Sequence, residues 1–356
     1  MQGIELSRSF YFDVVRPWLD VAAPHLQHSA ALIGYGSELL GLDDEMSKDH
    51  NWGPRVHLFL SREDFDAHAQ HLMNAFSTVI PKHFLGEPIG LRNRPHPPAG
   101  GRWAVGAPEH GLEVHTIEAR LEGGLALESV DDLDALQWLG LSEQRLLAFT
   151  AGDVFHDDGE RLGKVRAALG YFPRDVWLYK IACQWRRIGE EQAFVGRAGM
   201  VGDDLGSRVI ASRLARDVMR MGFLLERRYA PYSKWFGSAF ARLPIAGALS
   251  PPLERALLAK DWNERGEALA AAYLLLANRQ MEDGVGDRFE PIIGPYYGRP
   301  FTTINADDAV EATVGAIEDP VLKALPVIGS LDQVTDLTPV LEDPKAAQRM
   351  MNGLVS

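Results

Sequence analysis

The stretch from Ala30 to Leu60 restricts the fold more than any other part of this chain. It opens with the continuous apolar run Ala30–Ile33, which is typical of a buried strand. The tight turn Gly34-Tyr35-Gly36-Ser37 follows, and a second apolar run at Val56–Leu60 predicts another strand. The segment between the turn and the second run is acidic, with Glu38, Asp43, Asp44, Glu45 and Asp49. A strand, a glycine-serine turn and a carboxylate on the next strand would together suit a nucleotide and its metal ion.

The spacing of Ser37 and Asp49, twelve positions apart, resembles the signature of the nucleotidyltransferase superfamily. In that signature a Gly-Ser or Gly-Gly turn precedes a strand that carries two carboxylates at alternate positions. Residues i and i+2 of a strand point to the same side, so two carboxylates can share the metal ions that bridge the phosphates of a nucleotide. The resemblance implies that Gly36 and Ser37 bind the phosphates and that Asp49 binds the metal.

The sequence departs from this signature at two places. The second carboxylate position is Asn51, whose amide oxygen can bind a metal but carries no charge. Trp52-Gly53-Pro54 follows at once, and proline removes a ladder hydrogen bond, so we expect the strand that carries Asp49 to be short or bulged. Two interpretations therefore remain open: an enzyme, or a binding module that has kept the fold and lost catalysis.

Longer phrases resemble a bacterial family of unknown function, the DUF4037 proteins. They are GYGSELLGLDDEMSKDHNWGPR, QWRRIGEEQAFVGRAG, DDLGSRVIASRLARDVMRMGFLLERRYAPYSKWFG and PVIGSLDQ. The family is usually placed with nucleotidyltransferase-like folds, and it implies no established substrate.

Composition excludes several classes of protein. A net charge of −13 means that nucleic acid or an anionic membrane would need a local basic patch, so we expect neither as a partner. The single cysteine, Cys183, excludes an internal disulfide. No segment has the pattern of a signal peptide or the length of a membrane span, so we expect a soluble cytoplasmic protein. No two histidines have metal-ligand spacing on a helix, so we expect no structural zinc.

The periodicity predicts an α+β protein: a nucleotidyltransferase-like mixed sheet with flanking helices, followed by an α-helical domain. The length of 356 residues suggests two or three domains. We expect an α/β domain over 1–130, a helical domain over 131–288, and a C-terminal extension over 289–356 that packs on the helical domain. The clearest helix is 203–228, and the strands expected besides the first are 55–60 and 112–117.

A third acidic residue is expected on a further strand of such a fold. Glu113 and His115 share one face of the strand LEVHTI, and Glu118 follows it. Glu113 is the first choice for a metal ligand and Glu118 the second. The alternative interpretation is the exposed polar face of an edge strand.

The helical half contains a concentration of basic and aromatic residues. Arg213, Arg216, Arg220 and Arg227 recur at helical spacing on one face. For most of this face we favour exposed arginines paired with acidic residues. The segment from Arg227 through Tyr229 to Lys234 is instead expected to contact a ligand, since arginine binds phosphate and tyrosine stacks on a base.

These observations predict transfer of a nucleotidyl group, AMP from ATP, to a hydroxyl of a small molecule or protein. The expected cofactors are Mg²⁺ and ATP, the expected partners are a nucleotide and an unknown acceptor, and a homo-oligomer is left open. The alternative is a non-catalytic nucleotide-binding or interaction module with a degenerate metal site at Asn51. The predicted residues are Asp49 and Glu113 for catalysis; Asp49, Asn51 and Glu113 for the metal; and Gly36, Ser37, Lys234, Arg227 and Tyr229 for the cofactor.

Overall fold

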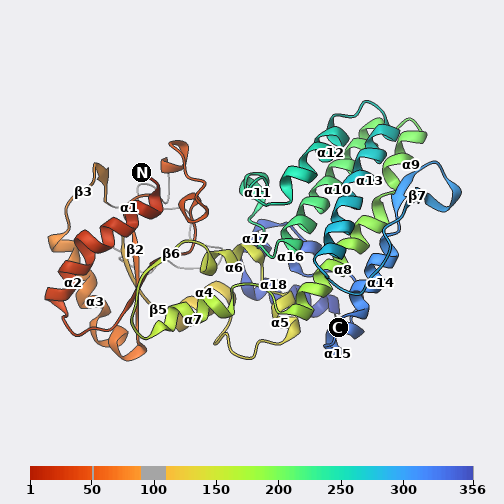
Figure 1. The fold of residues 1–356 in the computed structure, drawn as a ribbon. Helices are drawn as coiled ribbons and strands as arrows, with labels where there is room; N and C mark the ends of the chain where they lie inside the picture. The colour runs from red at the N-terminus through yellow and green to blue at the C-terminus, as the bar shows by residue number, and fades with distance from the viewer. Residues whose placement is uncertain (50–51, 90–109, 356) are drawn as a thin grey trace. The chain divides into compact units, whose positions relative to one another are not determined.

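The computed structural model describes residues 1–49, 52–89 and 110–355 (Figure 1), the side chains of Asp49 and Val355 excepted. The chain forms two compact units. The first comprises residues 1–133, 141–170 and 337–347, and the second comprises residues 134–140, 171–336 and 348–356. Among the described residues, no helix is long and apolar enough to cross a membrane.

A four-stranded mixed sheet forms the centre of the first unit, in the order β5-β2-β1-β6. Its strands are β1 (Ser29–Leu32), β2 (Val56–Leu60), β5 (Leu112–Thr116) and β6 (Asp153–Asp157). β1 is antiparallel to both β2 and β6, whereas β2 is parallel to β5. The two predicted apolar runs thus form the two central strands, and every residue of both is buried.

The N-terminal helices and α3 cover the hydrophobic side of this sheet. They are α1 (Gly3–Phe10), a π-helical segment (Tyr11–Val15), α2 (Arg16–Ala22) and α3 (Arg62–Val79). Phe10 and Phe76 meet edge to face at 6.3 Å between ring centroids, and both are completely buried. α3 begins at Ser61, whose hydroxyl accepts the backbone N–H of Asp64 and so satisfies one free donor of the first turn. A two-stranded hairpin of β3 (His83–Phe84) and β4 (Glu87–Pro88) follows α3.

The helical interpretation from residue 131 onward is wrong for one segment, because β6 returns to the sheet and pairs with β1. Its sequence DVFHD has only two apolar residues, so neither alternation nor hydrophobic content distinguishes it from a loop. Four short helices lie before and after β6 in the chain: α4 (Ile117–Leu125), α5 (Ala135–Leu139), α6 (Glu143–Thr150) and α7 (Arg161–Ala168). The first unit therefore extends past the predicted boundary at residue 130.

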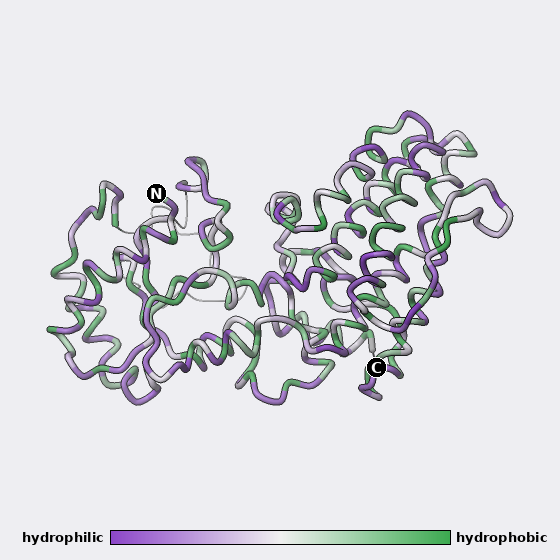
Figure 2. The backbone as a smooth tube through the Cα atoms, in the orientation of Figure 1, coloured by the Kyte–Doolittle hydropathy of each residue, from purple (hydrophilic) through white to green (hydrophobic). Residues whose placement is uncertain are grey.

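The second unit is helical, and Figure 2 shows hydrophilic and hydrophobic residues alternating along its helices. Its helices through the middle of the chain are α8 (Arg174–Glu191), α9 (Phe194–Met200), α10 (Asp204–Leu225), α11 (Ser233–Phe240), α12 (Ala246–Leu258) and α13 (Trp262–Glu282). α10 packs against α8, α9, α12 and α13, so its expected apolar stripe lies in the core. Inside this unit Arg265 is completely buried and pairs with Asp204 at 2.9 Å.

The C-terminal segment is divided between the units. A hairpin of β7 (Ile293–Pro295) and β8 (Thr302–Ile304), followed by α14 (Ala306–Gly315), α15 (Pro320–Ala324) and α16 (Leu331–Val334), belongs to the second unit. Residues 337–347, with α17 (Thr338–Leu341) and the start of α18 (Pro344–Val355), belong to the first. The expected packing of 289–356 on the helical domain is thus only part of the arrangement. The predicted α+β class, a mixed sheet with flanking helices and a helical domain, is confirmed.

Candidate functional site

The glycine turn after β1 is one side of a polar cluster in the first unit. Gly34 has φ 108° and Gly36 has φ 146°, a region that side-chain-bearing residues rarely adopt. A Cβ atom on Gly34 would lie 2.5 Å from Nη2 of Arg120, and one on Gly36 would collide with the carboxylate of Glu38. Ser37 then starts a 3₁₀ helix, Ser37–Leu40. The sequence requires glycine at both positions because these two side chains fill the space.

Glu38 and Arg55 form a buried ion pair beneath this turn. Glu38 is 3% exposed and Arg55 8% exposed. Burial raises the pKa of the Glu38 carboxyl, and the Arg55 guanidinium opposes that rise. Arg55 also donates to the backbone carbonyl of Tyr35 at 3.4 Å. The pair fixes the turn against the chain that enters β2, and it uses Oε1 of Glu38, whereas Oε2 is buried without a hydrogen-bond partner among the described residues.

Glu113 stands on the neighbouring strand between two imidazoles. In the register of the sheet Ala31, His57 and Glu113 form one row across β1, β2 and β5. Oε2 of Glu113 lies 3.0 Å from Nε2 of His115 and 3.8 Å from Nε2 of His57. Burial alone would raise the pKa of Glu113, but His57, His115 and Arg120 bring it well below its usual range. Glu113 is therefore a carboxylate at neutral pH.

His57 is neutral at the same pH. Burial lowers its pKa to about 3, against a partial rise caused by Glu113. Its Nδ1 atom is buried and has no hydrogen-bond partner among the residues that the structure describes. A buried polar atom without a partner is costly, so a bound group or water that reaches Nδ1 would be stabilised.

Arg120 connects the turn with the carboxylate. It comes from the first turn of α4, its guanidinium lies over Gly34, and it interacts electrostatically with Glu113 and Tyr35. Burial lowers the pKa of Arg120, but an arginine side chain stays charged at neutral pH. Within the described part of the chain no residue forms a hydrogen bond or a close ion pair with this guanidinium, and Glu113 is its main charged neighbour of opposite sign. Its N–H groups are thus available to an anion.

The predicted acidic residues belong to different elements. The backbone of Asp49 ends the 3₁₀ helix Met46–Asp49, outside β2, so the prediction of a strand at Asp49 is wrong. The reason is local, because Gly53 has φ 137° and Pro54 follows it, so pairing begins only at Val56. Asn51 lies outside the described residues, and its role as a metal ligand stays a prediction. Glu118, the second choice for the third carboxylate, is 54% exposed and pairs with Arg161 at 2.8 Å.

Three residues predicted to bind the cofactor lie in the second unit. Tyr229 is 6% exposed and packs against the rings of Tyr171 and Phe172, with centroids 5.1 and 5.0 Å away. Arg227 lies over the ring of Trp177 at 4.6 Å, and Lys234 is exposed in the first turn of α11. These placements make Tyr229 a core residue, and binding of a nucleotide by any of the three stays a prediction.

The arginine face of α10 borders a cavity of about 480 Å³ within the second unit. Arg213 pairs with Glu191 at 3.0 Å, and Arg216 pairs with Asp336 at 2.6 Å. Arg187 of α8, which also lines the cavity, pairs with the buried Asp217 at 3.1 Å. The favoured interpretation of this face, exposed arginines paired with acidic residues, is confirmed for Arg213 and Arg216.

Sequence reasoning missed the residues that complete the cluster. It assigned no role to His57, Arg55 or Arg120. A charged residue inside or next to an apolar strand is a usable signal, since burial of an unpaired charge is costly. Arg55 at the start of β2 carries that signal, whereas Arg120 is one of several polar residues on α4.

Comparisons with known proteins support part of this description. Residues 138–236 match the model of the family described as "Domain of unknown function (DUF4037)", so the resemblance found in the sequence is confirmed there. A search of curated proteins finds no match. Among solved structures the chain is similar to a nucleotidyltransferase-like protein from Exiguobacterium sibiricum 255-15, with a TM-score of 0.30 and 12% identity over 82% of each chain. The fold assignment above rests on the strands and helices themselves.

Proposed function

We propose that the first unit binds a nucleoside triphosphate, ATP in the first instance, and transfers its nucleotidyl group to a hydroxyl of a small molecule or protein. One observation carries the proposal. The unpaired guanidinium of Arg120 lies over the glycine turn and faces the ionised carboxylate of Glu113. An anion-binding donor beside a carboxylate that can hold a cation is what a phosphate–metal pair requires.

The residues present suit such a group. Arg120 would bind phosphate oxygens, and the backbone N–H groups around Gly36 and Ser37 would add donors. Magnesium in nucleotide sites uses one or two protein carboxylates besides phosphate oxygens. Glu113 supplies one, and Asp49 is proposed as the second. Bound Mg²⁺ would neutralise the charge that develops on the phosphates as the bond to the leaving pyrophosphate breaks.

The acceptor hydroxyl oxygen would form a new bond to the α-phosphorus while its proton passes to a base. Arg120 would stabilise phosphate charge in place, and its position on a helix that packs against β5 keeps it there without reorganisation. Glu113 would remain ionised, because the hydrogen bond with His115 and the charge of Arg120 favour its charged form.

The alternative is a nucleotide-binding module without catalysis. It is favoured by the surroundings of Glu113: its close partners among the described residues are two histidines, and no second carboxylate adjoins it on the sheet. Asp49 does not lie on β2. Binding that needs no Mg²⁺ and leads to no transfer would support this alternative.

ATP binding by the full chain tests both versions, with calorimetry and thermal shift in the presence and absence of Mg²⁺. We expect Arg120→Met and Glu113→Gln to weaken ATP binding at least ~10-fold, the loss of one charge-assisted hydrogen bond. Only Glu113→Gln should also reduce the dependence on Mg²⁺. Arg161→Met and Glu118→Gln, the exposed ion pair on the same side of the chain, are matched controls and should change neither.

Transfer is measured with ATP labelled at the α-phosphate and pools of hydroxyl acceptors. Label that appears on an acceptor and is lost in Arg120→Met supports the enzyme. Binding without transfer supports the module. If the wild-type chain shows no thermal shift or heat with any nucleoside triphosphate, both versions are wrong.

A further inference from the structure

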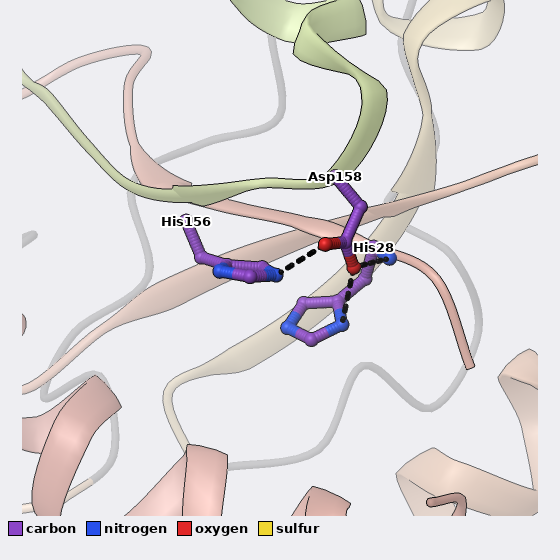
Figure 3. Close-up of side chains that lie close together, drawn as sticks. All are labelled: His28, His156 and Asp158. Carbon is purple, nitrogen blue, oxygen red and sulfur yellow. Dashed lines mark hydrogen bonds and ion pairs between the residues drawn. The ribbon is translucent and has the colours of Figure 1, made fainter. Parts of the chain in front are cut away.

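A second polar cluster lies at the opposite end of β1 from the glycine turn. His28 directly precedes β1, His156 belongs to β6, and Asp158 follows β6. One ligand atom from each lies within 4.8 Å of the other two. Figure 3 shows the carboxylate of Asp158 between the two imidazole rings. His28 and His156 are 128 positions apart in the sequence, and the antiparallel pairing of β1 with β6 brings them together.

We propose that His28, His156 and Asp158 bind one divalent transition-metal ion of the zinc type. Two imidazoles and a carboxylate are a donor set that suits zinc and disfavours magnesium, which prefers oxygen ligands alone. The proposal is independent of the nucleotide site, because it uses other residues and another class of metal.

The separations of the donor atoms support this assignment. Ligands 2.0–2.1 Å from a tetrahedral zinc ion lie about 3.3 Å from one another. Nε2 of His156 is 3.0 Å from Oδ1 of Asp158, and Nδ1 of His28 is 3.9 Å from Oδ2 of the same carboxylate. The backbone carbonyl of Leu26 lies 3.2 Å from Nδ1 of His28 and accepts its N–H when that nitrogen is protonated, so the metal would replace this proton. Both histidine–aspartate separations lie within about 0.6 Å of the tetrahedral value.

The second ring nitrogen of His28, Nε2, has a hydrogen-bond partner, as is usual for histidines that bind a metal. Nε2 lies 2.9 Å from the hydroxyl of Tyr11, which is completely buried. If Nε2 carries the proton and donates to Tyr11, Nδ1 keeps a lone pair for the metal. Metal-binding histidines almost always donate their second nitrogen in this way.

The three proposed ligands are accessible to an ion from solvent, and hydrogen bonds hold them in place. The side chain of His28 is 4% exposed, whereas those of His156 and Asp158 are 25% and 37% exposed, so an ion can enter from their side. The backbone N–H of His28 donates to Oδ2 of Asp158 at 3.1 Å, which fixes the carboxylate. Asp157 is not part of the set, because it accepts from Ser29 and caps α7.

The positive charge of the neighbouring Arg16 would weaken binding of a metal ion at this cluster. Nη1 of Arg16 lies 3.3 Å from Nδ1 of His156 and 3.4 Å from the Tyr11 hydroxyl. Its charge is partly offset by Asp20, with which it pairs at 2.8 Å. Removal of this positive charge should change the metal affinity in the direction opposite to removal of a ligand. We therefore expect Arg16→Gln to bind the metal more tightly, which a purely structural histidine pair does not predict.

The test uses the full chain, stripped of metal with a chelator and titrated with Zn²⁺ by calorimetry and with Co²⁺ by visible absorption. We expect one equivalent of Zn²⁺, a rise in Tm on binding, and the d–d absorption of a tetrahedral cobalt site. Magnesium in excess should not compete. His156→Ala and Asp158→Asn should weaken binding roughly 100-fold or more, and Tyr11→Phe about 10-fold, as found for direct and supporting partners.

His25→Ala is the matched control, since His25 is exposed three positions before His28, and it should bind Zn²⁺ like the wild type. Circular dichroism and Tm of each metal-free variant show whether it folds. If Asp158→Asn does not fold, His156→Ala is used for the test, because His156 is partly exposed. The proposal is overturned if the wild type takes up no stoichiometric Zn²⁺, or if His156→Ala binds it as tightly as the wild type.

Discussion

His57 on β2 and Glu113 on β5 are direct partners in the parallel register, and Nε2 of the histidine lies 3.8 Å from Oε2 of the carboxylate. The imidazole is neutral because it is buried, and the carboxylate is charged because its neighbours offset its own desolvation. The two groups therefore give the folded state a particular dependence on pH, which leads to the first two predictions.

Glu113 should stabilise the fold less as the solution becomes acidic. Its folded-state pKa lies below its ordinary value of 4.5, so its contribution is fully present above about pH 4.5 and is lost as pH falls toward the folded-state value. We expect the difference in Tm between wild type and Glu113→Gln to shrink below that pH. A difference that stays constant from pH 6 down to the acid transition would contradict the assignment.

His57 should make the free energy of unfolding fall with acidification at a higher pH. In the unfolded chain His57 takes up a proton near its ordinary pKa of 6.5, whereas in the folded chain it does so only near a pKa of about 3. Between these values the unfolded state holds more protons, so stability decreases as pH falls, by as much as ~1.4 kcal/mol per pH unit. Urea denaturation across this window should show a shallower slope for His57→Gln. An unchanged slope would mean that His57 is protonated in the folded protein.

Alanine at Gly34 should be destabilising, because φ of 108° is strained for alanine and Nη2 of Arg120 occupies the space of a Cβ. We expect a cost of about 1–3 kcal/mol in the free energy of unfolding. Gly123 in α4 is the control: it is helical with nothing within 4 Å of a Cβ, so Gly123→Ala should gain about 0.5–1 kcal/mol. Urea denaturation measures both, and equal effects would refute the argument.

Removal of Glu38 should be far more costly than removal of a surface acid. Glu38→Gln leaves the buried Arg55 without its counter-charge, and such losses cost about 3–5 kcal/mol. Asp66→Asn breaks the exposed pair with Arg62 and should cost less than about 0.5 kcal/mol. The double variant Glu38→Gln with Arg55→Met should recover part of the loss. If it is additive with the single variants, the two residues do not interact.

The sequence identified the parts of the fold that have a local signature. The apolar runs became β1 and β2, LEVHTI became β5, and the periodic segment 203–228 became α10, because buried strands and amphipathic helices require those patterns. β6 was not predictable from its own five residues, since its strand character depends on β1 as a partner.

Some parts of the candidate site were likewise predictable from local sequence, and others were not. The glycine turn and the shared face of Glu113 and His115 were predictable from spacing alone. The position of Arg120 over Gly34 was not, because it depends on how α4 packs. The histidine pair with Asp158 joins residues from two ends of the first unit, and only the pairing of distant strands brings them together.

The order in which the chain is synthesised gives the divided first unit a consequence for folding. A fragment that ends at residue 130 lacks β6, so the edge of β1 would present unpaired N–H and C=O groups to other chains. A chain synthesised as far as residue 170 still lacks part of the first unit. The guanidinium of Arg145 lies 3.3 Å from the carboxylate of Glu342, which is synthesised much later. A nascent chain therefore carries an unfinished sheet until β6 is synthesised and an incomplete first unit until residues 337–347 follow, and that interval is when it would depend most on chaperones.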